Sequence, residues 1–450
     1  MDELRLLSPQ GMLGYGYPEE SLRRGLEASP HMIGVDSGST DAGPYRLGSG
    51  KPTVPREAVK RDLSLMLEGA LELGIPLLVG SAGGAGAREH VEWVLDILDE
   101  VVLERGKRLS LAVIWSDVDK NWLLEKLGKG DVKPLGPVEP LESEDVLRAR
   151  RIVAVMGVAP YIEALEGGAQ VVIAGRSNDP AIFASFALWK GFSPGLAFHL
   201  GKILECGAMA SVPGSASDSM LGVLKEDRFL VEPLNPARRC TEVSVAAHTL
   251  YEKSDPFRIP GPEGVLNLEK VSFRQVGERR VEVRGSAFEP ASECWIKLEG
   301  ACQEAYHSIF IAGIRDPVMI SRVEEWQGAT RRALEEYFGC GGWRVLFHVY
   351  GKDGVMGSLE PVKETSSHEL GLVFEAVAPT QEEAQAICSF ARSFLMHYHY
   401  RGRKATAGNL ALLYSPSDIP MGPVYSFNVH HLVKVEDPLE PFRVEFMEVG

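Results

Sequence analysis

The first half of the chain alternates short apolar runs with longer segments in which apolar residues recur every three or four positions. Residues 58–73 place Val59, Leu63 and Met66 on one face of a predicted helix, and residues 75–79 then form an apolar run typical of a buried strand. The same alternation continues over 88–105, 109–114, 151–155, 161–166 and 169–174. Apolar strands separated by amphipathic helices predict an α/β domain with a mostly parallel sheet that is covered on both faces.

The pattern changes after Pro256, where prolines and glycines predict a linker. Alternating apolar positions between 271 and 284 then predict antiparallel strands. Farther on, strand and helix patterns follow the order β-α-β-β-α-β, at 307–312, 317–337, 343–350, 370–377, 380–398 and 424–433. This order is typical of a ferredoxin-like domain, with its helices on one face of an antiparallel sheet. We therefore expect an α/β domain over 1–255, which carries the site, and a smaller α+β domain over 256–450.

Glycine-rich segments directly follow three of the predicted strands, at 36–50, 80–86 and 175–179. Ligands of open α/β sheets bind beyond the carboxyl ends of the strands, so these segments are expected to meet at one edge of the sheet. The predicted pocket there gathers residues from all three segments, namely Asp36, Ser37, Ser39, Asp41, Ser81, Gly83, Gly84, Arg176 and Asn178.

The segment 34–50 consists mostly of polar and small residues, with the carboxylates of Asp36 and Asp41 among hydroxyl side chains and glycines. Glycines let backbone N–H groups approach a ligand, and the two aspartates can move a proton or hold a divalent cation. The same residue types also build tight connectors, so a structural turn is the alternative. We expect Asp36 and Asp41 to be catalytic, and Ser37 and Ser39 to contact the substrate.

The segment 80–86 opens the helix predicted from residue 88. The free N–H groups and the dipole of a helix N-terminus attract a carboxylate or a phosphate. Close packing of the helix on the sheet is the alternative reason for so many glycines. The residues expected to contact an anionic substrate here are Gly80, Ser81, Gly83 and Gly84.

The segment 175–180 repeats this arrangement with a different set of side chains. Asp179 and Pro180 fit the first positions of a helix, as its cap and its first residue. Arg176, Ser177 and Asn178 then remain for the substrate, and arginine suits a carboxylate or a phosphate because its planar N–H groups bind both oxygens.

Two further groups of residues suggest acid–base chemistry. On a helix over 199–207, His199, Lys202 and Cys206 share one face and would supply a base or a nucleophile. A surface lysine above a buried cysteine is the alternative. Glu205 lies beside them and is a further acid–base candidate.

His248 and Glu252 are four residues apart on another predicted helix. They would form a metal-ligand pair or an acid–base pair, and a structural hydrogen bond between them is the alternative. We expect His248 to take part in catalysis.

The charge balance excludes several classes of protein. A formal net charge of −15 without a basic stripe argues against a nucleic-acid or membrane surface as the main partner. The six cysteines are scattered, without the spacing of a zinc site, and are expected to be reduced thiols in a cytoplasmic protein. No phosphate-binding or dinucleotide motif has the required spacing, so no cofactor is predicted, apart from a divalent cation if Asp36 and Asp41 hold one.

Several of these blocks together resemble the acyclic terpene utilisation family. The blocks are Gly14-Tyr15-Gly16, 34–44 with Leu47-Gly48-Ser49-Gly50, 80–84, 174–177, 201–208, 244–252 and 312–317. The resemblance covers nearly the whole chain, although this chain is shorter than the terpene-pathway members. It implies a part in the breakdown of acyl-CoA or carboxylate intermediates, and some relatives are encoded beside a small companion protein.

We therefore expect a cytoplasmic enzyme, and a homo-oligomer, with lyase, hydratase or isomerase chemistry on a small anionic substrate, either a carboxylate or its CoA thioester. The expected catalytic residues are Asp36, Asp41, Lys202, Glu205 and His248. The alternative is a non-catalytic or half-catalytic subunit that acts only with a small companion protein.

Overall fold

The computed structural model describes residues 2–39, 42–52, 54–251 and 253–450. The chain is an α/β protein with two compact units. Unit 1 comprises the residues up to Cys302 together with Phe427–Gly450, and unit 2 comprises Gln303–Ser426. These bounds differ from the expected division after residue 255, because the strands between 258 and 290 belong to unit 1.

Unit 1 contains a ten-stranded sheet in the order β14-β15-β10-β9-β1-β2-β3-β7-β4-β22. Its central strands are parallel: β1 (Leu4–Ser8), β2 (Met32–Asp36), β3 (Leu77–Gly80), β7 (Val171–Ala174) and β4 (Leu109–Trp115). Its outer strands pair antiparallel: β9 (Met220–Leu224), β10 (Arg228–Pro233), β15 (Arg280–Arg284), β14 (Ser272–Val276) and β22 (Arg443–Val449). The sheet is therefore mixed rather than mostly parallel. Turns of three residues join β9 to β10 and β14 to β15, and such short turns permit only antiparallel pairing.

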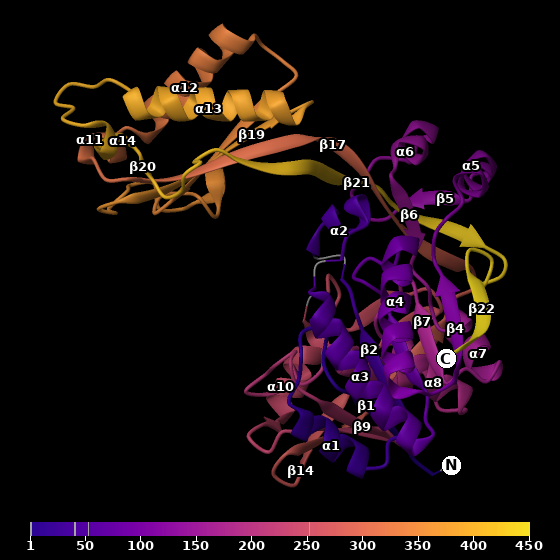
Figure 1. Ribbon diagram of the computed structural model, residues 1–450. Helices are drawn as coiled ribbons and strands as arrows, with labels where there is room; N and C mark the ends of the chain where they lie inside the picture. Colours follow the sequence, from indigo (N-terminus) through magenta and orange to yellow (C-terminus); the bar gives the residue numbers. More distant parts are fainter. Residues whose placement is uncertain (1, 40–41, 53, 252) are drawn as a thin grey trace. The chain divides into compact units, whose positions relative to one another are not determined.

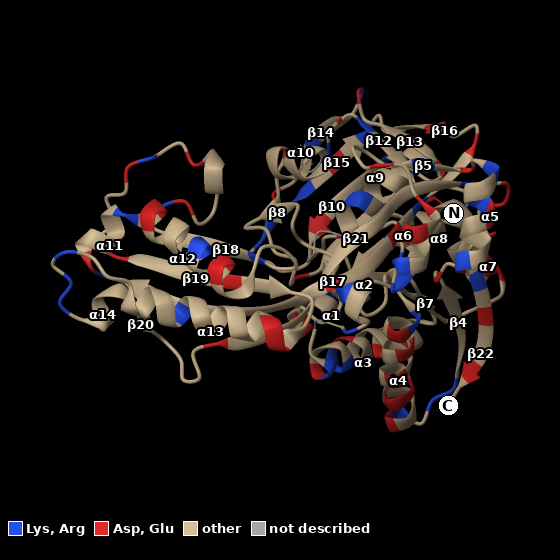
Figure 2. Cartoon of the chain, turned by 90° about the horizontal axis from the view of Figure 1, so that it is seen from above, with Lys and Arg blue, Asp and Glu red and all other residues tan. Residues whose placement is uncertain are grey.

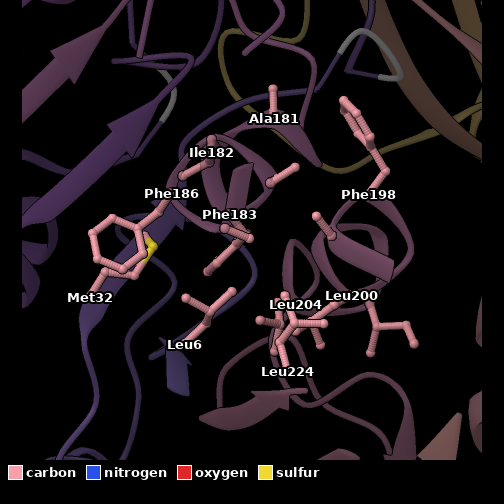
Figure 3. Close-up of a cluster of buried hydrophobic side chains, with 14 of the residues drawn as sticks. Leu6, Met32, Ala181, Ile182, Phe183, Phe186, Phe198, Leu200, Leu204 and Leu224 are labelled. Carbon is pink, nitrogen blue, oxygen red and sulfur yellow. The ribbon is translucent and has the colours of Figure 1, made fainter. Parts of the chain in front are cut away.

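Alternate residues of the central strands face two different layers of helices (Figure 1). Leu6 and Met32 pack with one layer, and Leu7 and Ile33 pack with the other. The first layer consists of α7 (Ala159–Glu166), α8 (Ala181–Trp189) and α9 (Pro194–Leu204), and the second includes α3 (Arg56–Leu73) and α4 (Arg88–Arg105). Figure 3 shows Leu6 and Met32 beside Phe183 of α8. The period of two along each strand thus buries both faces of the sheet.

Shorter elements complete unit 1. They are α1 (Glu19–Glu27), α2 (Tyr45–Ser49), α5 (Lys120–Lys129), β5 (Val132–Pro134), α6 (Ser143–Arg148), β6 (Arg151–Ala154), β8 (Ser211–Val212), β11 (Arg239–Cys240), α10 (Glu242–Leu250), β12 (Arg258–Gly261), β13 (Gly264–Asn267) and β16 (Ala287–Pro290). The apolar run at 151–155 was expected in the parallel sheet. Instead, β6 pairs antiparallel with β17 (Cys294–Ile314), with Ala154 opposite Leu298. A short apolar run does not specify its partner strand, which explains the difference.

The longer elements of unit 2 follow the order strand, helix, strand, strand, helix, strand, and its sheet has the strand order β18-β19-β17-β21. Its elements after the start of β17 are α11 (Pro317–Ser321), α12 (Val323–Phe338), β18 (Arg344–Tyr350), β19 (Leu370–Ala378), α13 (Gln381–His397), α14 (Thr406–Asn409), β20 (Ala411–Leu412) and β21 (Ile419–Val435). Helices α12 and α13 lie on one face of this sheet (Figure 1). Phe310, Trp326, Phe374 and Leu395 are fully buried between these helices and the sheet.

Acidic and basic residues are interspersed over the chain, and most of the charged side chains on α4 are acidic (Figure 2). Within the part of the chain that the structure describes, no helix is both long and apolar enough to cross a membrane.

Candidate functional site

A cavity of about 830 Å³ opens in unit 1 where the chain leaves β1, β2 and β7. The segment after β1 contributes Tyr15, the segment after β2 contributes Asp36 and Ser39, and the segment after β7 contributes Arg176 and its neighbours. The remaining charged and polar side chains on its wall are Ser177, Asn178, Asp179, Lys202, Glu205, Cys206, Tyr251, Lys253 and Lys297. The site thus lies at the carboxyl ends of parallel strands, where open α/β sheets bind ligands.

Asp36 ends β2 and is only 5% exposed. Its Oδ2 accepts a hydrogen bond from the Gly38 N–H at 3.2 Å. Its Oδ1 is buried without a hydrogen-bond partner among the described residues. Burial raises the pKa of Asp36 well above its ordinary value, the nearby charge of Asp179 adds to this, and Arg176 opposes it.

Arg176 is held in place by several buried groups. Its Nε donates to Glu299 Oε2 at 3.1 Å, and its Nη1 donates to Ser81 Oγ at 3.0 Å and lies 3.7 Å from Asp179 Oδ1. Glu299 lies on β17 and also binds Lys297 Nζ at 2.7 Å. Burial opposes the charge of Arg176, but the carboxylates of Glu299, Asp179 and Asp36 outweigh it and raise its pKa.

Ser81 binds Arg176 and adopts an unusual backbone conformation. Its φ is +48°, in the left-handed region that residues other than glycine rarely adopt. Two hydrogen bonds hold it there, from Ser81 N–H to Gly175 O at 2.9 Å and from Arg176 Nη1 to its Oγ. Strain of this kind persists where the surroundings impose it, often at functional sites.

Glu205 and Lys202 reach the cavity from the end of α9. Burial raises the pKa of Glu205 well above its ordinary value, Asp179 adds to this, and Lys202 and Lys253 oppose it. Its Oε2 is buried without a hydrogen-bond partner among the described residues. Burial likewise raises the pKa of Asp179, against the effect of Arg176. Three carboxyl groups with raised pKa values therefore share one cavity.

The structure separates the three residues that were predicted to share one helix face, His199, Lys202 and Cys206. Lys202 and Cys206 line the cavity, whereas His199 is fully buried and bonds to Ser286 Oγ and Thr249 Oγ1, at 2.7 and 2.9 Å. Burial lowers the pKa of His199 to about 3, so it is a neutral structural residue. Burial raises the pKa of Cys206 to about 12, which keeps it a thiol rather than a reactive thiolate.

Tyr251 contacts both Cys206 and Lys202 on this side of the cavity. Its hydroxyl lies 3.3 Å from Cys206 Sγ, and its ring centroid lies 4.8 Å from Lys202 Nζ. His248 stacks on the same ring at 4.7 Å and is not part of the cavity wall. Burial and the charge of Lys202 lower the pKa of His248 to about 4. Its predicted partner Glu252 lies outside the described residues, as does Asp41.

The glycines of the segment 80–86 are not part of the cavity wall. The N-terminus of α4 holds the protein's own carboxylate, since the Arg88 N–H donates to Asp117 Oδ1 at 3.0 Å. A Cβ on Gly83 would lie 2.7 Å from His90 Cβ, and one on Gly86 would overlap Arg176 N. Close packing is therefore one reason for the glycines at 83 and 86, and contact of Gly80, Gly83 and Gly84 with an anionic substrate stays a prediction. Ser81 reaches the site through Arg176.

The serines and the asparagine of the other two segments differ in position. Ser39, Ser177 and Asn178 line the cavity, whereas Ser37 is buried beside it with its Oγ unpartnered among the described residues. Ser177 Oγ lies 2.7 Å from the hydroxyl of Tyr161.

Several residues of the site were missed in the sequence. Asp179 was assigned to a helix cap, but α8 begins at Ala181 and its N-cap residue is Pro180. Lys297 and Glu299 lie on a strand without any motif, and Tyr251 lies beyond the end of a helix. No local signal marks these three, because the fold alone brings Lys297 and Tyr251 to the cavity and Glu299 to Arg176.

Within the described ranges, no group of three histidine, cysteine, aspartate or glutamate side chains is arranged to hold a metal ion. A cation between Asp36 and Asp41 remains a prediction, since Asp41 is not described.

The model of the acyclic terpene utilisation family protein AtuA matches residues 56–218 and 229–412. The chain belongs to this family. The AtuA ranges include Arg176, Lys202 and Glu205 of the cavity, whereas Asp36 and Ser39 precede them. Comparisons with curated proteins and with solved structures gave no match.

Proposed function

We propose that the cavity of unit 1 carries out acid–base chemistry, as a lyase, hydratase or isomerase, on a small carboxylate or its acyl-CoA thioester. The family's name supports a catabolic role in acyclic terpene utilisation. One observation carries the proposal: Asp36, Asp179 and Glu205, all with raised pKa values, face the same cavity as Lys202 and Arg176. A carboxyl group whose pKa approaches the working pH is able both to accept and to donate a proton.

Glu205 is the proposed proton carrier, because its buried Oε2 has no competing hydrogen bond among the described residues. In the ionised form it takes a proton from the carbon next to the substrate carbonyl, and the C–H electron pair moves into the carbonyl as an enolate. The proton then returns to another carbon in an isomerisation, or to a leaving hydroxyl group, which departs as water. The cations of Lys202 and Arg176 stabilise the enolate oxygen.

The proposed steps transfer a proton and shift an electron pair within the substrate, without net oxidation or reduction. The proposal therefore includes no redox cofactor. If Asp36 and Asp41 hold a divalent cation, it would polarise the substrate carbonyl. Turnover after dialysis against a chelator, with and without added Mg²⁺, distinguishes a required cation from none.

The test of the proposal is Glu205→Gln, assayed with a panel of acyl-CoAs and carboxylates. The loss of a proton carrier is expected to lower kcat by a factor of about 10² or more. Glu100→Gln is the matched control, since Glu100 binds Lys60 and Arg56 on the surface of unit 1. Undiminished turnover by Glu205→Gln would refute the proposed role.

A second candidate is a subunit that acts only with a small companion protein. Exposed apolar side chains in one segment of unit 2 favour it: Val355 is 85% exposed, Leu359 77% and Val362 66%. Such patches often mark contacts with other proteins, including further copies of the same chain. Size-exclusion chromatography of the isolated chain, followed by the activity assay, separates the two, because full turnover by the chain alone excludes an obligate companion.

A further inference from the structure

A second cavity adjoins the one that holds Asp36, Arg176 and Glu205, which we call the acid–base cavity. It has a volume of about 530 Å³, and its described wall belongs to unit 1. The residues on the walls of both cavities are Leu135, Val155, Asn178, Pro260 and Lys297. The two cavities are therefore continuous, and a single ligand is able to extend from one into the other.

The wall of the second cavity is mostly apolar. Its larger apolar side chains are Leu135, Val155, Val265, Trp295 and Leu432, and prolines and small residues lie between them. We call this cavity the apolar chamber. Val155 is buried and the other four are half-buried. Ligand pockets are lined mainly by apolar side chains of this kind, because covering them removes apolar surface from water.

Strand β17 connects the chamber with the acid–base cavity. Ile296 packs in a core of unit 1, so Trp295, Lys297 and Glu299 share the opposite face of the strand. Trp295 lines the chamber, Lys297 lines both cavities, and Glu299 binds Arg176 with 3.1 Å between Oε2 and Nε. Consecutive side chains on one strand face therefore lead from the apolar chamber to the charged groups.

The sheet β12-β13-β16 forms part of another side of the chamber. Val265 is the central residue there, since it lies opposite Pro260 on β12 and opposite Glu289 on β16. All three residues line the chamber. Side chains of paired residues project from the same face of a sheet, so Val265 points into the chamber between its two neighbours.

The charged side chains on the chamber wall already have partners within the protein. They are Lys133, Glu289, Glu293 and Lys297. The last three form ion pairs with other side chains of unit 1. The ammonium group of Lys133 instead lies 3.6 Å from the ring centroid of Trp295. A polar ligand would have to compete with these partners, whereas a hydrocarbon chain needs none.

We propose that the apolar chamber binds the hydrocarbon chain of the substrate, while the carboxylate or thioester carbonyl lies in the acid–base cavity near Lys202 and Glu205. The identity of this ligand as a substrate rests on the proposed function, whereas the preference of the chamber for a hydrocarbon chain does not. The substrate is accordingly an acid or acyl thioester with a chain of several carbons, rather than a compact dicarboxylate.

The experiment measures binding of the full chain to sodium butyrate, hexanoate and octanoate by calorimetry. These three carboxylates share one charged group and differ only in the length of the chain. Complete burial of a CH₂ group tightens binding about fourfold. The Kd of the wild type for octanoate is therefore expected to be lower than that for butyrate by a factor of about 10 or more.

Two variants of the chamber wall test where the chain binds. Val265→Phe fills the chamber and is expected to weaken octanoate binding about tenfold, with little effect on butyrate, whose chain is too short to depend on the chamber. Trp295→Ala removes the largest apolar side chain of the wall and is expected to weaken octanoate binding severalfold. It leaves more space rather than less, so it tests the proposal even if Val265→Phe does not fold.

Val276→Phe is the matched control. Val276 is also half-buried on a strand of unit 1, at the end of β14, and does not line the chamber. This control is expected to keep the wild-type preference for octanoate over butyrate. Thermal unfolding of each variant shows whether it is folded.

Equal binding of butyrate and octanoate by the wild type would overturn the proposal. So would a preference for octanoate that persists undiminished in the folded chamber variants, because the chain would then bind elsewhere. Displacement of octanoate by free coenzyme A, with coenzyme A binding lost in Val265→Phe, would overturn the hydrocarbon assignment in favour of the pantetheine arm of a thioester. Failure of the proposed function is distinguishable, because full turnover by Glu205→Gln leaves the dependence of binding on chain length unchanged.

Discussion

Arg176 and Glu299 form a buried ion pair, with 3.1 Å between Arg176 Nε and Glu299 Oε2 and both residues at most 5% exposed. The two residues are 123 positions apart, one beyond the end of β7 and the other on β17. The pair fixes the guanidinium so that its Nη1 reaches both Ser81 and Asp179. The position of the cation in the cavity thus depends on a residue that does not line it.

Glu299→Ala is expected to destabilise unit 1 by about 3–5 kcal/mol, because it leaves a buried arginine with one fewer partner. Glu299→Gln keeps an acceptor of the same shape and is expected to cost less. Chemical denaturation measures both, and Glu100→Ala, at an exposed ion pair, is expected to cost about 1 kcal/mol or less. Equal losses for Glu299→Ala and Glu100→Ala would contradict the role of the buried pair.

Asp36→Ala is expected to abolish activity while leaving the Tm unchanged or higher. The reason is that Asp36 is a desolvated carboxyl group with a raised pKa, which the fold stabilises poorly. Asp36→Asn tests the charge alone, since it keeps the shape. A structural turn residue would behave in the opposite way, with lowered stability and full activity in the folded fraction.

Gly86→Ala is expected to disturb the site through packing. Its φ is +67°, and an added Cβ would overlap the backbone N of Arg176. Gly106 is the matched control, because its φ is +57° and no atom lies near the position of an added Cβ. Gly106→Ala is therefore expected to lower the free energy of unfolding only through backbone strain, by about 1–2 kcal/mol. Gly86→Ala should cost clearly more and lower the activity. Equal costs in chemical denaturation would show that the 175–176 backbone tolerates the contact.

Two of the buried histidines, His199 and His248, predict a loss of stability in mild acid. Their pKa values are about 3 for His199 and about 4 for His248 in the folded chain, below the ordinary value of 6.5. As the pH falls below about 6.5, the unfolded chain binds protons that the folded chain does not, so the free energy of unfolding decreases down to about pH 3–4. His199→Gln should show a shallower decrease than the wild type in unfolding measured between pH 4 and 7. An identical slope would exclude this contribution.

Glu205 acts in the opposite direction. Its folded pKa is raised, so the folded chain retains a proton that the unfolded chain releases as the pH rises above about 4.5. The contribution to stability is therefore lost with rising pH, up to the folded pKa. Glu205→Gln cannot ionise, and its stability relative to the wild type should increase from pH 4 to pH 7. A constant difference over this range would contradict the raised pKa.

Local sequence patterns predicted the strands around the cavity because each is a short apolar run that ends in polar and small residues. Asp36, Ser39, Arg176 and Asn178 were predicted together, since parallel strands bring their carboxyl ends to one edge. Lys202 and Glu205 were identified as candidates from residue type alone, and the structure adds their position at the same cavity.

The rest of the site could not be predicted, because it depends on pairing over long distances in the chain. Lys297 reaches the cavity, and Glu299 reaches Arg176, only because β17 pairs with β6, and no local pattern specifies that pairing. The glycines at 83 and 84 suggested an anion cradle, yet glycine serves equally where two backbones touch. The sequence gives no sign that the carboxylate of Asp117, 29 residues from Arg88, binds the N-terminus of α4.

Strand β17 is one continuous strand of 21 residues, from Cys294 to Ile314. Lys297 and Glu299 lie near one end, and Phe310, in the core of unit 2, lies near the other. Side chains of a strand alternate between its two faces. A one-residue shift in the pairing of a strand therefore moves each of its side chains to the opposite face of the sheet. Within unit 1, a one-residue shift of β17 against β6 would turn Glu299 to the opposite face of the strand and leave the guanidinium of Arg176 without this partner.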